Sequence, residues 1–124
     1  MIVKEIEIDS KKVKFRASAT VSRLYRRFFG RDIFKDMQSL SKKADEAEKD
    51  GKQFEIDDLE MFENVAFVMA KHADPSQPDN ADDWLEQFDT FSIYQVLPQI
   101  LELWRLDNAT TVESKKKFMQ LAGK

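Results

Sequence analysis

Apolar and polar residues alternate in two short segments at the beginning of the chain, residues 2–8 (IVKEIEI) and residues 13–17 (VKFRA). Alternation with a period of two is typical of strands that bury one face. The inward positions are predicted to be Ile6, Ile8, Val13 and Phe15. The polar stretch DSKK is predicted to form a four-residue turn, and the outward Lys and Arg side chains protect the strand edges. We therefore predict a β-hairpin over residues 1–18.

From residue 20 to residue 106 the apolar positions recur every three or four residues, which is the period of a helix. The first helix is predicted to have Thr20 as its N-cap and to end at Gly30. A second helix is predicted from about residue 32 to residue 50, ended by Gly51. Its apolar stripe thins from Ile to Ala, so we expect its far end to be solvated or packed against something thin.

The start of the third helix carries a capping signature. Asp57 is predicted to be the N-cap, with Glu60 closing a capping box and Ile56 packing on Met61 as a hydrophobic staple. The helix that follows, DLEMFENVAFVMAKHA, is apolar nearly all round beyond Asn64. A helix of this kind is buried on most sides, so we expect it to be the central helix of the domain.

Two more helices are predicted after the loop DPSQPDN. The first is short and acidic, covers residues 82–89 (DDWLEQFD), and is capped by Asp79 or Asn80. The second begins at residue 93, where the pair of Ser92 and Gln95 repeats the capping-box pattern.

Pro98 interrupts this last helix beyond its first turn. It leaves the carbonyl of Tyr94 without a helical partner, which costs roughly 3 kcal/mol or produces a kink. We expect the apolar segments 62–70 and 93–104 to pack together. The predicted fold class is α+β, mostly α-helical, with an N-terminal β-hairpin followed by a compact bundle of about five helices.

The length of 124 residues fits one domain. We expect a single globular domain over residues 1–106 and a polar tail over residues 107–124. The chain has no cysteine, so disulfides are excluded and a reducing compartment fits. Its first residues, MIVKEIEIDS, lack the apolar stretch of a signal peptide, and no apolar run approaches the roughly 20 residues of a membrane span. We therefore expect no membrane partner and a cytoplasmic location.

Charge is distributed unevenly along the chain, although the net charge is only −3. Residues 10–31 contain eight Lys or Arg and no acid, whereas residues 72–104 contain seven Asp or Glu and no Lys or Arg. If the fold keeps these regions apart, they can steer charged partners or support head-to-tail self-association. If they pack near one another, they neutralise each other, and the sequence leaves both arrangements open.

The residues that catalysis or cofactor binding needs are few. One histidine and no cysteine argue against a zinc site, and we expect His72 to interact with the last carbonyls of its own helix. Neither GxGxxG nor GxxxxGK[ST] occurs, which excludes these nucleotide-binding loops. The acids at residues 79–86 lack the order and the glycine of a calcium loop. We therefore expect no enzyme, no metal and no cofactor.

Three stretches resemble the tail assembly chaperones of long-tailed, siphovirus-type bacteriophages and of prophages of Gram-positive bacteria. They are KKVKFRASATVSRLYRRFFGRDIFKDM, FENVAFVMAKHADP and WLEQFDTFSIYQVLPQILELW, and together they cover roughly residues 1–110 in order. The resemblance implies a protein that coats the long tape measure protein, keeps it soluble and helps to recruit major tail protein subunits. Many members of that family also exist in a longer form made by programmed ribosomal frameshifting, whose junction would fall in residues 107–124.

The leading hypothesis is thus a non-enzymatic chaperone in the cytoplasm of the host bacterium, absent from the mature virion. Its expected partners are the tape measure protein, the major tail protein and a second copy of itself. A tape measure protein is long, helical and apolar on one side, and methionine suits the adaptable surface that would hold it. The candidate partner-binding residues are Arg23, Arg26, Arg27, Met61, Met69, Tyr94, Leu97 and Trp104. The last five also fit ordinary core positions, which we favour for each of them.

The alternative is a small phage-encoded regulatory protein that binds nucleic acid through the basic region from Arg16 to Arg31. Aromatic residues lie among these arginines, as in many such surfaces. The spacing of a helix-turn-helix is missing, however, so we favour a solvated helix face for this region. A third possibility is a structural tail component that stays in the virion.

Overall fold

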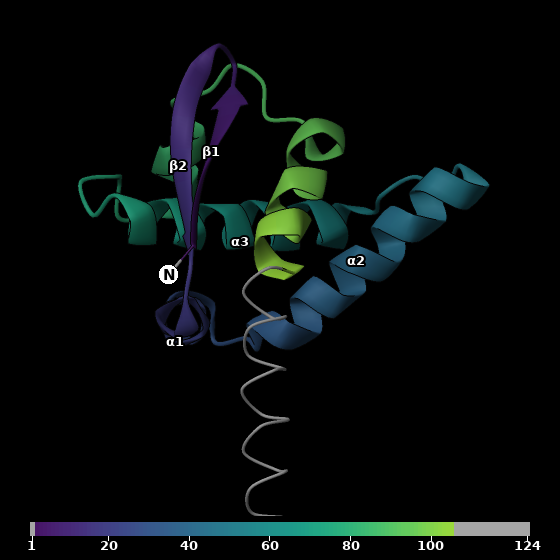
Figure 1. Cartoon of the computed structure of the whole chain (residues 1–124), viewed down its shortest axis with the longest axis horizontal. Helices are drawn as coiled ribbons and strands as arrows, with labels where there is room; N and C mark the ends of the chain where they lie inside the picture. Colours follow the sequence, from purple (N-terminus) through teal and green to yellow (C-terminus); the bar gives the residue numbers. More distant parts are fainter. Residues whose placement is uncertain (1, 106–124) are drawn as a thin grey trace, which may run out of the picture.

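The computed structural model describes residues 2–105, in which an N-terminal hairpin precedes five helices (Figure 1). The strands are β1 (Ile2–Ile8) and β2 (Lys11–Ala17). The helices are α1 (Ala19–Phe29), α2 (Ile33–Asp50), α3 (Ile56–Ala73), α4 (Ala81–Leu85) and the 93–105 helix. The predicted fold class, α+β and mostly α-helical, is confirmed. The predicted tail over residues 107–124 lies outside the described residues.

The hairpin turns in two residues rather than in the predicted four. β1 and β2 pair antiparallel in a register that sets Ile6 opposite Val13. Asp9 and Ser10 form the turn with positive φ angles of 54° and 65°, as in the primed turns whose twist matches that of paired strands. The prediction of a DSKK turn was wrong because its two lysines continue the ladder as the first residues of β2.

Two long-range contacts hold the hairpin against later parts of the chain. The Asp9 carboxylate accepts a hydrogen bond from the backbone N–H of Asp89 at 3.0 Å. The Lys4 ammonium forms an ion pair with the Glu102 carboxylate at 2.8 Å. The tip of the hairpin is thus joined to the loop before the 93–105 helix, and the far end of β1 is joined to that helix.

Two helix starts differ by two residues from the predicted N-caps. Ser18 caps α1 instead of Thr20, whose backbone N–H donates to Ser18 Oγ at 3.2 Å. Glu55 is the N-cap of α3 instead of Asp57, and the Glu55 backbone N–H donates to Asp58 Oδ2 at 2.9 Å. At the start of α1, Ser and Thr are both favoured N-cap residues, so the pattern does not rank them, whereas at the start of α3 the favoured Asp57 is passed over for Glu55, which forms a capping box with Asp58.

The predicted hydrophobic staple at the start of α3 does not form. Ile56 is 82% exposed, because the earlier helix start makes it the first residue of α3 rather than the residue before the N-cap. The ends of α1 and α2 agree with prediction, since Gly30 and Gly51 adopt left-handed φ angles of 65° and 69°. Glycine adopts this conformation at little cost and so ends a helix cleanly.

A buried carboxylate fixes the corner between α1 and α2. Asp36 accepts a hydrogen bond from the Tyr25 hydroxyl at 2.6 Å, and Arg31 donates to both of its oxygens at 2.8 Å. The three side chains come from α2, α1 and the connection between them. Burial and the contact with Asp36 raise the pKa of Tyr25, so its hydroxyl stays protonated and continues to donate.

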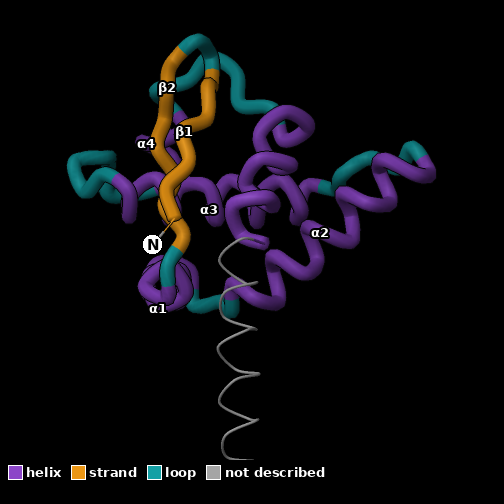
Figure 2. Tube along the Cα trace, viewed as in Figure 1, coloured by secondary structure: helices purple, strands orange, loops and turns teal. Residues whose placement is uncertain are grey.

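The helix α3 is central, as predicted. It runs across the middle of the molecule in Figure 1 and Figure 2 and packs against β2, α1, α2 and α4. Its residues 65–70 are almost completely inaccessible to solvent. Buried residues of α3 and of the 93–105 helix belong to one continuous core, so the two apolar segments pack into one body.

An aromatic cluster anchors α4 to this core. The helix spans Ala81–Leu85 and is therefore shorter than the predicted residues 82–89. Asn80 caps it, since its side-chain oxygen accepts a hydrogen bond from the Asp83 backbone N–H at 2.8 Å. Trp84 is completely buried. Its ring centroid lies between 5.2 and 6.3 Å from those of four phenylalanines, Phe15, Phe67, Phe88 and Phe91.

Candidate functional site

A groove opens between the C-terminal half of α2 and the 93–105 helix. The two helices diverge, so that the end of α2 extends away from the 93–105 helix (Figure 1). The cavity between them has a volume of about 540 Å³. We call it the α2 groove. It is lined by Ala44, Asp45, Ala47, Glu48, Gly51, Lys52, Gln53, Phe54, Ile93, Tyr94, Leu97, Pro98, Leu101 and Arg105.

Three of the residues on the α2 side of this groove are small. Ala44, Ala47 and Gly51 line it at a spacing of three and four positions, which places them on one side of α2. Both alanines are only partly buried. The thin stripe seen in the sequence therefore faces an open space, and another backbone can approach α2 closely there.

The opposite wall is bulky and apolar. Tyr94 stands at its lip with 59% of its surface exposed, and its ring packs 5.4 Å from that of Phe54. Leu97 and Leu101 form the floor and are buried. Pro98 also lines the groove and is exposed, and the chain stays helical through it.

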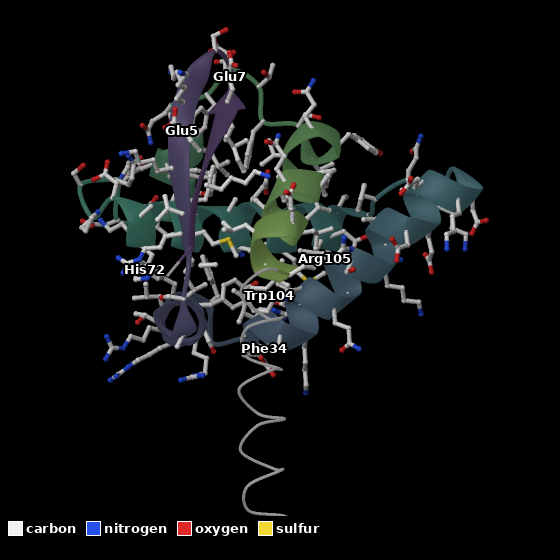
Figure 3. The ribbon with its side chains drawn as sticks, viewed as in Figure 1. Glu5, Glu7, Phe34, His72, Trp104 and Arg105 are labelled. Carbon is white, nitrogen blue, oxygen red and sulfur yellow. The ribbon has the colours of Figure 1, made fainter. Side chains whose placement is uncertain are left out.

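The apolar surface continues beyond the groove along α2. A second hollow of about 570 Å³ shares Asp45, Leu101 and Arg105 with the groove. Phe34 lines it, is 50% exposed, and packs its ring 5.2 Å from that of Trp104. Figure 3 shows Phe34, Trp104 and Arg105 close together where the 93–105 helix meets α2. We call this region the Phe34 hollow.

Four charged residues line the groove, two acidic and two basic. Asp45 and Glu48 are exposed on the α2 wall, and neither forms an ion pair within residues 2–105. Lys52 and Arg105 also line the groove, and Arg105 donates a hydrogen bond to Ser41 Oγ at 3.3 Å. The wall formed by residues 93–101 contributes no charged side chain.

The predicted partner-binding residues fall into separate groups. Arg23, Arg26 and Arg27 are exposed on α1 and line neither the α2 groove nor the Phe34 hollow. Tyr94 and Leu97 are brought together in the groove, and Trp104 lies in the adjoining hollow. The structure therefore gathers three of the eight candidates along the 93–105 helix and leaves the arginines on another helix.

The five apolar candidates also differ in how much of each side chain is exposed to solvent. Met69 is completely buried in the core, which agrees with the favoured interpretation, and Leu97 is reached only as the floor of the groove. Trp104 is 8% exposed. Met61 is half-buried and lies with its sulfur 4.0 Å from an Arg31 nitrogen. Only Tyr94 among these five offers a largely exposed surface to a partner.

Several residues of the groove were not foreseen as binding residues. Ala44 and Ala47 were visible in the sequence only as a thinning stripe, and Gly51 only as the end of the second helix. Phe34 follows the buried Ile33 and lies off the stripe of α2, and this off-stripe aromatic residue was the available signal. Small residues and single off-stripe aromatics are common in helices, so neither pattern identifies a binding surface by itself.

His72 makes a contact different from the predicted one. Its Nε2 lies 2.7 Å from Ser18 Oγ, so it joins the end of α3 to the N-cap of α1. Burial and the nearby Arg16 lower the pKa of His72, which favours the neutral imidazole. Among residues 2–105, the contact observed for the His72 ring is this one with Ser18, in place of the expected one with the last carbonyls of α3.

Two features of the described residues bear on the kind of site. Among residues 2–105 no group of three or more His, Asp or Glu side chains is placed to hold a metal ion. No helix in the same part of the chain combines the length and apolar character needed to cross a bilayer.

The chain matches no protein-family model, no curated protein and no solved structure. A proposal of function therefore depends on the resemblance of its sequence segments and on the geometry of the α2 groove.

Proposed function

We propose that this protein is a phage tail assembly chaperone that binds the tape measure protein and helps to recruit the major tail protein, without catalysing a reaction. The resembling segments support this proposal by their places in the fold. KKVKFRA forms β2, RLYRRFFGRD covers the corner between α1 and α2, FENVAFVMAK lies in α3, and FSIYQVLPQILELW leads into the 93–105 helix. Each segment thus corresponds to one structural unit.

The α2 groove is the observation that carries the proposal. A tape measure protein is expected to be long, helical and apolar on one side, and such a helix needs cover until the tail tube surrounds it. The groove presents an apolar floor between two helices, one of which has a wall of small residues. A third helix can pack there in the manner of helix-in-groove recognition.

Co-expression with a tape measure protein tests the proposal. We expect the intact chain to raise the soluble fraction of the tape measure protein and to co-purify with it. Tyr94→Ser should weaken this binding by about 1–2 kcal/mol, or roughly tenfold, because it removes the exposed apolar lip of the groove. The measurements are the soluble fraction and the amount retained on the tagged chain.

Val3→Ser is the matched control for this experiment. Val3 is 52% exposed on the outer face of the hairpin and does not line the groove, so its loss should leave binding unchanged. A tape measure protein that is equally soluble and unbound without the chain would rule the proposal out. Mass spectrometry of purified particles adds a second criterion, because a chaperone of this kind acts in the host cytoplasm and should be missing from the virion.

A nucleic-acid-binding regulator is the second candidate, and the surface of α1 favours it. This helix contains no acid, and Arg23, Arg26 and Arg27 are exposed and form no ion pair with any residue from 2 to 105. A site of this type gives binding that weakens steeply as salt rises. For a chaperone we expect no such binding to duplex DNA or RNA when titrated at two ionic strengths, and a steep salt dependence would favour the regulator.

A further inference from the structure

We propose that the α2 groove selects an amphipathic helix that carries two basic side chains, one turn apart, along one edge of its apolar stripe. This inference rests on the proposed function of the groove and adds the chemistry of the partner. It concerns the charged α2 wall, whereas the chaperone proposal itself needs only the apolar floor.

The shape of the groove favours a helix as the occupant. α2 and the 93–105 helix diverge, and the space between them has small side chains on one side and Tyr94, Leu97 and Leu101 on the other. Packed helices lie 8–10 Å apart on average, and small residues permit the closer distances. A helix inserted here contacts both walls at once and covers the half-exposed end of α2.

The charges of the α2 wall favour a basic edge on that helix. Asp45 and Glu48 are three positions apart, so both project on the same side of α2. They are exposed beside the apolar floor and without a cationic partner among residues 2–105. A partner helix with Lys or Arg at matching spacing pairs with both, whereas an acidic edge is repelled.

Lys52 and Arg105 are the basic residues that line the groove, and they limit where the basic side chains of the partner helix can lie. Along α2 and the residue after its end, the order of charges is Asp45, Glu48 and then Lys52. Arg105 and Asp45 both lie at the boundary with the Phe34 hollow, since each lines both cavities. A continuous basic stripe would therefore meet repulsion at Lys52 and at Arg105, whereas a pair of basic side chains that reaches only Asp45 and Glu48 fits better.

Peptide binding to the full chain tests this inference. Two labelled synthetic helices of about 18 residues share one Leu/Ala stripe, and each carries two charged side chains on one edge, Lys in the first and Glu in the second. We expect the intact chain to bind the Lys peptide roughly tenfold more tightly at low salt, as judged by fluorescence anisotropy. The double variant Asp45→Lys, Glu48→Lys should reverse this preference.

A second double variant separates a local effect from one of net charge. Glu46→Lys, Asp50→Lys makes the same change of charge on α2 at residues that do not line the groove, so it should keep the preference of the intact chain. Equal affinity for the two peptides, or no binding of either, would overturn the inference. So would self-association of the intact chain that is lost in Asp45→Lys, Glu48→Lys, because the occupant would then be a second copy.

The outcome is distinct from that of the co-expression experiment. In one outcome the chain prefers the Lys peptide but does not bind the tape measure protein. This outcome would reject the chaperone function and keep the charge selectivity of the groove. Binding of the tape measure protein that is unchanged in Asp45→Lys, Glu48→Lys, with no preference between the peptides, would keep the function and reject the selectivity.

Discussion

Trp84→Ala is expected to lower the free energy of unfolding by about 3–4 kcal/mol, the largest effect of any single substitution proposed for this protein. The indole is completely buried among phenylalanines from β2, α3 and the segment after α4. A helix of five residues cannot hold itself in place, so α4 depends on this side chain. Domains have total stabilities of about 5–15 kcal/mol, so the loss should be visible in any denaturation curve.

Urea denaturation followed by circular dichroism measures this effect, and Trp104 remains as a fluorescent reporter in the variant. Trp84→Phe is the matched control. Trp84 Nε1 has no hydrogen-bond partner among the described residues, so the control loses volume but no hydrogen bond and should cost only about 1–2 kcal/mol. A loss of under about 1 kcal/mol for Trp84→Ala would mean that the aromatic cluster contributes little to the core.

Asp36→Ala is expected to cost about 3 kcal/mol. Among residues 2–105, the substitution removes the only acceptor of the Tyr25 hydroxyl, which lies on a completely buried side chain, and an unsatisfied buried hydroxyl costs about 1–3 kcal/mol. It also removes two charge-assisted hydrogen bonds from Arg31. The Arg31 side chain is 56% exposed, so its guanidinium returns to water and adds little to the penalty. Urea midpoints of the variant and the intact chain measure the difference.

The pH dependence of stability provides an independent check on Asp36. Hydrogen bonds from Arg31, and then from Tyr25, lower the pKa of Asp36 in spite of its burial. A carboxyl whose folded pKa is depressed stabilises the fold above its unfolded pKa of about 3.9, and that contribution is lost as pH falls through the folded pKa. The intact chain should therefore lose stability below about pH 4 more steeply than Asp36→Ala.

An exposed aspartate is the control for this second prediction. Asp45 on the same helix forms no ion pair within the described chain, so Asp45→Ala should change the free energy of unfolding by less than about 0.5 kcal/mol. Identical acid profiles for the intact chain and Asp36→Ala would contradict the assigned role of the buried carboxylate.

Much of the fold was predictable because local chemistry determines it. The hairpin follows from a period of two, and Gly30 and Gly51 end their helices because glycine readily adopts the left-handed conformation. The all-round apolar segment of α3 could only be buried. The N-cap at Ser18 was missed because Ser and Thr are both favoured N-cap residues, whereas Glu55 was missed because glutamate is not among the favoured N-cap types and Asp57 is.

The open space between α2 and the 93–105 helix was not predictable from the sequence, although some of the residues that line it were. Helical periodicity indicated which side of α2 and of the 93–105 helix is apolar, but it contains no information about the angle at which two helices cross. That angle decides whether Ala44 and Ala47 are covered or face an open space. Tyr94 was proposed as a binding residue from its apolar surroundings, and only the structure separates its exposed ring from the buried Leu97.

The ribosome makes β1 several seconds before the residues that hold it. Lys4 and Glu102 are 98 positions apart, and Asp9 and Asp89 are 80 positions apart. At a synthesis rate of roughly 5–20 residues per second, the apolar face of the nascent hairpin stays uncovered until the segments containing Asp89 and Glu102 have been made. The native state is complete only when the segment containing residue 102 has emerged, and such distant pairings make folding slower than in bundles of purely local contacts.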